Sequence, residues 1–286
     1  MRKPMFAGSF YPKSADQLNK MLSDCFTAEK GPGAVPVHPV RPEPPLKAVV
    51  VPHAGYAYSG MCAAWAYNAI ADSELPDVFI LLGPSHHSGR SGISIDTFET
   101  PIGMARPDQE FAKRLVAKGS LKVDEELHLD EHSIEVQLPM LQFALGKRAD
   151  GMKILPLLVS SDLELDAAAR DLVQVIKELK RKVTFIVSSD FTHYGREYGY
   201  VPFTENVAER IAKLDGELIE MIKNGDYKGF EKHVFDTGAT VCGALPIGLM
   251  LRAVKFSKAN LEQYYTSSEL SGDDKASVSY ASIVFK

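Results

Sequence analysis

The chain has 286 residues, of which 45% are hydrophobic and 24% are charged, and its formal net charge is -5. This length and composition allow one large α/β domain or two small ones with a sizeable core, whereas the acidic balance argues against nucleic acid as a general partner. The longest apolar runs are strand-sized and the N-terminus lacks the apolar core of a secretion signal, so we expect a soluble, cytoplasmic protein without a membrane span.

The first predicted element is a helix that Ser14 can cap, because apolar residues recur after it at helical spacing as far as Phe26. Six prolines then fall within 31–45 and predict an extended surface loop, since each proline fixes φ and withholds a donor. The β-branched run at 47–51 predicts the first strand of the core.

The middle of the chain alternates predicted helices with nearly continuous apolar runs, which indicate strands covered on both faces. Asp108 can cap a helix that stops at Gly119, and Pro139 is expected to kink the helix that follows. The elements expected here are helices at 59–71, 108–119, 133–145 and 165–180, and strands at 78–82, 153–159 and 183–187.

The last third predicts helices at 204–223 and 244–254, and then two alternating segments at 261–266 and 277–285. Alternation of this kind predicts added antiparallel strands, so the sheet is expected to be mixed but largely parallel. We therefore expect a single α/β domain over residues 1–286, built as a sandwich in which helices flank a central sheet.

Histidine-rich motifs follow three of the predicted strands. Functional groups in open α/β sheets collect beyond the carboxyl ends of strands, and imidazole, thiolate and carboxylate are the side chains that bind transition metals. The sequence therefore predicts a metal site. The residues are His53 after the first strand, His86 and His87 after the second, and Asp190 and His193 after the strand at 183–187.

A single histidine after a strand is more often a turn or capping residue than a ligand. For His53, the adjacent Gly55 and a second histidine after the next strand favour metal binding over that interpretation. His86 and His87 are adjacent and point opposite ways in extended backbone, so only one of them is expected to reach the ion.

Cys242 is the best sulfur ligand, because it precedes a predicted helix whose dipole favours thiolate, although free cysteine is commonly a small buried hydrophobe. The other two thiols, Cys25 and Cys62, lie on helices and are expected to be buried and reduced. Asp190 and His193 form either an Asx-turn with a capping histidine or a general base with its orienting carboxylate.

A fifth motif places Glu131 and His132 at the start of a predicted helix, where His132 and Glu135 would share one face. Acidic residues at that position also complement the helix dipole, so ordinary capping explains part of the pattern.

Taken in order, these motifs resemble those of the Memo family, the mediator of cell motility family. The matching segments are Ala7-Gly8-Ser9-Phe10-Tyr11, Pro52-His53-Ala54-Gly55-Tyr56, Leu82-Gly83-Pro84-Ser85-His86-His87, Asp130-Glu131-His132-Ser133-Ile134-Glu135, Ser188-Ser189-Asp190-Phe191, Cys242-Gly243, Pro246-Ile247-Gly248 and Ser277-Val278-Ser279-Tyr280-Ala281.

The family is similar to the class III extradiol ring-cleaving dioxygenases, which hold non-haem Fe(II) with two His and one Glu in an α/β sandwich. The resemblance implies that Cys242 replaces the dioxygenase carboxylate, and the softer thiolate favours copper or zinc as well as iron. The implied site has His53, His86 and Cys242 as metal ligands, His193 and Asp190 as catalytic residues, and Tyr58, His132 and His87 in the pocket wall.

Two function classes fit this pattern. The first is a redox-active metalloprotein that binds Fe(II) or copper, with zinc as an alternative, and acts on oxygen or a small-molecule substrate. The second is a non-catalytic module whose pocket captures a peptide or phosphopeptide of a partner protein, as the eukaryotic family members suggest. Ring cleavage of a catechol has the weakest support, because fold does not fix function and the Glu ligand is missing.

Overall fold

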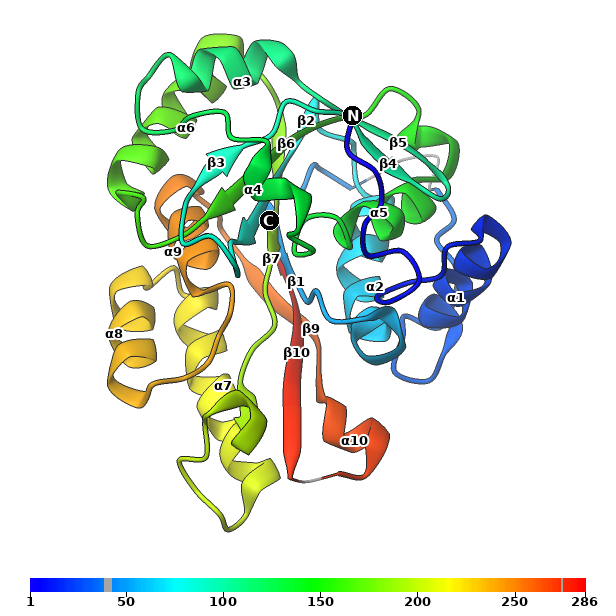
Figure 1. Cartoon of the computed structure of the whole chain (residues 1–286), viewed down its shortest axis with the longest axis vertical. Coiled ribbons are helices and arrows are strands. Elements are labelled where there is room, and N and C mark those ends of the chain that lie inside the picture. Colours follow the sequence, from blue (N-terminus) through cyan, green and yellow to red (C-terminus); the bar gives the residue numbers. More distant parts are fainter. Residues whose placement is uncertain (39–42, 274) are drawn as a thin grey trace.

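A mixed sheet runs through the computed structural model, which describes residues 1–38, 43–273 and 275–286 (Figure 1). Its strands are β1 (Ala48–Val51), β2 (Val78–Pro84), β3 (Gly92–Ile93), β4 (Phe98–Thr100), β5 (Gly103–Pro107), β6 (Lys153–Val159), β7 (Val183–Ser188), β8 (His193–Gly195), β9 (Ala259–Thr266) and β10 (Ala276–Phe285). They lie in the order β4-β5-β6-β2-β7-β1-β10-β8, with β3 beside β6 and β9 beside β10.

The centre of the sheet is parallel and its margins are antiparallel. β5, β6, β2, β7 and β1 form successive parallel pairs, whereas β10 pairs antiparallel with β1, β8 and β9. The four apolar runs predicted as buried strands are β1, β2, β6 and β7, and the two alternating segments are β9 and β10. The predicted α/β class with a mixed central sheet is confirmed.

Helices cover both faces of this sheet (Figure 1). Successive side chains of β1 enter opposite cores, with Val50 in one and Val49 and Val51 in the other, as the pleat of a strand requires. One core contains α1 (Ala15–Thr27), α2 (Tyr56–Asp72) and α5 (Gln137–Leu145); the other contains α3 (Gln109–Val116), α6 (Leu165–Leu179), α7 (Val207–Lys223), α8 (Tyr227–Thr237) and α9 (Ala244–Ala253).

Two short helices complete the fold: α4 (Glu126–Leu129), whose Leu127 joins the core of α1, α2 and α5, and α10 (Ser267–Ser271), which precedes β10. No helix among the described residues combines the length and apolarity needed to cross a bilayer.

Pro139 does not kink a helix, because α5 begins at Gln137 rather than at 133. Pro139 therefore lies in the first turn, where backbone N–H groups have no partner within the helix and the missing donor costs nothing. Most described residues of the predicted 31–45 loop are exposed, and the part at 39–42 lies outside the described residues.

Asp108 caps α3 as predicted: its carboxylate accepts a hydrogen bond from the Phe111 N–H at 2.9 Å. We expect Asp108→Ala to lower the free energy of unfolding by about 1 kcal/mol, the usual effect of losing a side-chain cap. Ser14 precedes α1 but makes no such bond, so Ser14→Ala is the matched control and should change stability by less than about 0.5 kcal/mol. Urea denaturation of the two variants tests this difference, and equal losses would contradict it.

Candidate metal centre

Three neighbouring parallel strands end at the same edge of the sheet, and residues predicted for the metal site follow them there. β2, β7 and β1 are adjacent in the sheet, so their carboxyl ends lie side by side. His53 follows β1, His86 follows β2 and Asp190 follows β7. The convergence expected from the sequence is therefore present.

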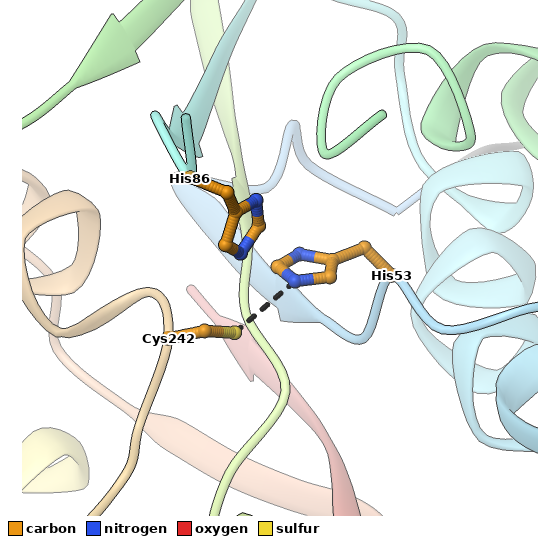
Figure 2. A group of neighbouring side chains, drawn as sticks. All are labelled: His53, His86 and Cys242. Atoms are coloured by element: carbon orange, nitrogen blue, oxygen red, sulfur yellow. Dashed lines mark hydrogen bonds between the residues drawn. The ribbon is translucent and has the colours of Figure 1, made fainter. Parts of the chain in front are cut away.

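The candidate ligand atoms of His53, His86 and Cys242 all lie within 4.8 Å of one another. Figure 2 shows the three side chains pointing toward a common point from separate segments of the chain. His53 Nε2 lies 3.1 Å from Cys242 Sγ, and the His53 and His86 ring centroids are 5.3 Å apart.

Glu131 orients His86. Its carboxylate accepts from the His86 backbone N–H at 2.7 Å, from the Ser133 N–H at 2.8 Å and from His86 Nδ1 at 3.0 Å. A carboxylate partner fixes the proton on Nδ1, so His86 Nε2 is the atom left for an ion. Burial acts to raise the pKa of the Glu131 carboxyl, but the hydrogen bonds from His86 and Ser133 hold that pKa well below its usual range.

Cys242 lies in the turn before α9, pressed against the end of β7. Its Sγ accepts from the Asp190 N–H at 3.1 Å, and the Gly243 N–H donates to Ser189 Oγ at 3.0 Å. A Cβ at position 243 would lie 2.3 Å from Ser189 Cβ, so only glycine permits this close approach. Gly243 therefore helps to place the thiol beside His53.

The expectation that the helix dipole favours thiolate at Cys242 is not met. Burial, and then the Asp190 carboxylate, raise the pKa of the Cys242 thiol well above its ordinary value. Desolvation of the thiolate outweighs the dipole of the helix that follows. Burial likewise raises the pKa of Cys25 and Cys62, and all three thiols are free.

Asp190 supports His53 rather than His193. Its Oδ1 accepts from the His53 N–H at 2.8 Å and from the Ala54 N–H at 3.4 Å. His193 Nδ1 lies 2.9 Å from the Phe191 carbonyl and 3.1 Å from the Thr240 carbonyl. Because a carbonyl only accepts, Nδ1 carries the proton and Nε2 is the basic atom. The expected orienting carboxylate is thus replaced by two backbone carbonyls.

The three residues expected in the pocket wall lie at different depths. His132 stacks on His86 with centroids 4.8 Å apart and meets His53 edge-on at 5.3 Å. Burial lowers the pKa of His132 to about 3. His87 and Tyr58 are exposed, and the His87 ring centroid lies 6.3 Å from that of His86. His132 therefore belongs to the centre and His87 lies beside His86, whereas Tyr58 is an exposed residue of the first turn of α2.

Glu135 does not share a functional face with His132. It is fully buried, pairs with Arg2 at 2.6 Å and accepts from the Tyr11 hydroxyl at 2.6 Å. Phe10, in the same N-terminal segment, packs its ring 4.6 Å from that of His132. The N-terminal segment thus forms one wall of the centre, which the helical spacing could not indicate.

Two residues that contact the predicted site residues were not predicted to do so. Ser188 Oγ contacts His53 Nδ1 at 2.8 Å, and the Tyr198 ring meets His193 edge-on at 5.2 Å. Ser188 was visible within the Ser188-Ser189-Asp190 motif, but serine is common in turns and gives no specific signal. Tyr198 lies in a short loop helix, η2 (Arg196–Tyr198), without a motif.

The donor set fits a first-row transition ion. Ligands about 2.0–2.3 Å from a tetrahedral ion lie roughly 3.3–3.7 Å apart, so side-chain movements of about 1 Å let the three atoms close on one ion. A second group, His86, Glu131 and His132, also lies within 4.8 Å. The Glu131 oxygens already accept from two backbone N–H groups and from His86, so this group orients His86 instead.

The fold and the site define an α/β protein with a His/His/Cys cluster at the carboxyl edge of its parallel strands. The chain belongs to the Memo family: the Memo-like protein profile matches residues 2–284. It is 37% identical over 294 residues to a MEMO1 family protein of Methanopyrus kandleri, covering 100% of this chain and 99% of that one. It is 38% identical over 292 residues to one of Methanosarcina barkeri, covering 99% of each chain.

Among solved structures, the chain resembles the crystal structure of an uncharacterized protein from Escherichia coli K12. The TM-score is 0.51 at 15% sequence identity, and the match covers 84% of this chain and 100% of the other. At this identity the likeness extends to the fold alone.

Proposed function

We propose that this chain is a redox-active metalloprotein that binds one Fe(II) or copper ion, or alternatively zinc, through His53, His86 and Cys242. The single observation that carries the proposal is the convergence of these three donor atoms within 4.8 Å. Two imidazoles and a thiolate are donors that such ions prefer. Three protein ligands leave a coordination position open, as in catalytic rather than structural metal sites.

A bound iron or copper ion would supply one-electron chemistry and a Lewis-acid position for oxygen or a small substrate. The protein supplies the arrangement around it. Glu131 holds the His86 ring through Nδ1, and Asp190 holds the backbone at His53 and Ala54. His132 and Phe10 form an uncharged wall of the site, because the lowered pKa of the buried His132 keeps its ring neutral.

His193 is the residue we assign to proton transfer. Its Nδ1 proton is held by two carbonyls, so Nε2 can accept a proton from a substrate and return it. The edge of Tyr198 restricts rotation of the ring. Ring cleavage is not part of the proposal, because the resemblance implies that Cys242 replaces the carboxylate ligand of the dioxygenases.

Metal affinity should rise with pH, because the ion must displace a proton from Cys242. Burial lowers the pKa of His53 well below its ordinary value, so that imidazole is already neutral, whereas the raised pKa of Cys242 keeps the thiol protonated. One released proton corresponds to about a tenfold gain in affinity per pH unit. Competition with a chromophoric chelator between about pH 7.5 and 8.5 measures the slope, and an affinity independent of pH would exclude the thiol as a ligand.

A direct test of the proposed activity compares oxygen consumption, with a reductant present, between the iron-loaded, copper-loaded and zinc-loaded protein. Redox turnover is expected with iron or copper and not with zinc, which has no redox chemistry. A protein that binds the ion but shows no turnover with any metal would favour the non-catalytic module that captures a partner peptide.

A further inference from the structure

We propose that Ser188 and Gln137 fix the tautomer of His53, placing its proton on Nδ1 and leaving Nε2 free as a ligand atom. The role as a ligand rests on the proposed function. The hydrogen-bond chain that sets the tautomer consists of protein groups alone, so the two ideas can fail separately.

The hydrogen-bond chain begins at Gln137, whose side-chain amide has one allowed orientation. Gln137 Nε2 lies 3.0 Å from the Pro52 carbonyl oxygen, which can only accept, so nitrogen and not oxygen must face it. The Tyr67 hydroxyl donates to Gln137 Oε1 at 2.7 Å, in agreement with this orientation. The second amide hydrogen is then directed at Ser188 Oγ, 2.8 Å away.

The Ser188 hydroxyl has a single hydrogen, and its partners determine where that hydrogen goes. Ser188 Oγ lies 2.6 Å from the Ser133 carbonyl, another group that only accepts, so the hydrogen is donated there. Ser188 already accepts from Gln137. The remaining contact, 2.8 Å from His53 Nδ1, can therefore only be one in which His53 donates.

Burial maintains these donor and acceptor roles. Tyr67, Gln137, Ser188 and His53 are each at most 3% exposed, so bulk water offers none of them an alternative partner. With the proton held on Nδ1, the bare Nε2 faces Cys242 Sγ at 3.1 Å. Gln137 touches neither the ion site nor a substrate, and it acts as a positioning residue through Ser188.

The two imidazole ligands are thereby oriented in different ways. His86 donates to an anionic carboxylate, which increases its donor strength, whereas His53 donates to a neutral hydroxyl. We call the hydrogen bonds from His53 and Gln137 to Ser188 the Ser188 relay. This neutral relay adds no negative charge next to Cys242 and Asp190, whose ionised forms are already disfavoured by desolvation.

The first measurement uses the intact, metal-free protein with 15N-labelled histidine. Long-range 1H–15N correlation spectra distinguish a protonated from a bare ring nitrogen. We expect His53 in the Nδ1–H form, and finding it in the Nε2–H form would overturn the proposal without any variant being needed.

The second measurement compares Ser188→Ala, Gln137→Met and, as the matched control, Ser282→Ala. Ser188→Ala removes the acceptor, so the Nε2–H form should gain, because that proton can turn toward Asp190 Oδ2, 3.9 Å from Nε2. Zinc affinity should fall about 10- to 100-fold. In Gln137→Met, Ser188 keeps its hydrogen bonds with Ser133 and His53, so the loss of zinc affinity should be smaller. The buried Ser282 hydroxyl has no hydrogen-bond partner among the described residues, so Ser282→Ala should change neither the His53 tautomer nor the zinc affinity.

An unchanged His53 tautomer and unchanged zinc affinity in Ser188→Ala would overturn the relay. If the wild-type protein has the Nδ1–H tautomer, and Ser188→Ala shifts it, but neither binds zinc, iron or copper, the relay stands and the proposed metal function fails.

Discussion

Replacing Cys242 by serine should reduce metal affinity by more than the roughly 100-fold that loss of an outer hydrogen-bond partner produces. The hydroxyl has nearly the shape of the thiol but does not ionise near neutral pH, so the ion would lose its only anionic ligand among His53, His86 and Cys242. His53→Ala should have a comparable effect, because it removes the most buried of the three donors.

The control for this comparison is Cys62→Ser. Cys62 is a fully buried thiol whose Sγ contacts the Gln263 carbonyl, outside the cluster. Metal content of each purified variant, after equilibration with a defined free metal concentration, is the measurement. Equal metal content in the wild type, Cys242→Ser and His53→Ala would remove the basis of the assignment.

The second large effect is expected at His193, whose removal should strongly reduce turnover but leave metal binding intact. His193 is held by the Phe191 and Thr240 carbonyls and by the Thr240 hydroxyl, which accepts from its backbone N–H at 2.8 Å. Loss of a general acid or base typically costs about 100- to 10,000-fold in rate. His193→Ala should therefore keep its metal while losing oxygen-dependent turnover by that factor.

His193→Gln is the informative companion variant, because an amide fills similar space and can still hydrogen-bond to Thr240 but cannot exchange a proton near neutral pH. It should be as inactive as His193→Ala. If His193→Ala loses its metal as completely as His53→Ala does, His193 is a ligand and the three-residue centre is incomplete.

The strands that carry the site could be predicted from the sequence, because β1, β2, β6 and β7 are buried on both faces and read as continuous apolar runs. The histidines follow these strands directly, so their convergence depended only on strand adjacency. Elements with a weak hydrophobic pattern were missed. α8 buries only Phe230, and β8 is a three-residue strand at the edge of the sheet, so neither has a strong hydrophobic period.

The roles within the site were harder to predict than its location. Whether Asp190 faces His53 or His193 depends on the path of the backbone after β7, and both lie within reach in sequence. The pKa of Cys242 depends on how deeply its turn packs against Ser189, which no local pattern records. The Ser188 relay involves Gln137 from a different element, a contact that only the tertiary structure creates.

The most direct test of the central claim is an anomalous difference map from crystals grown with the metal and measured at its absorption edge. We expect one peak about 2.0–2.4 Å from His53 Nε2, His86 Nε2 and Cys242 Sγ. A peak between His86, Glu131 and His132 instead, or no peak at this edge of the sheet, would contradict the account.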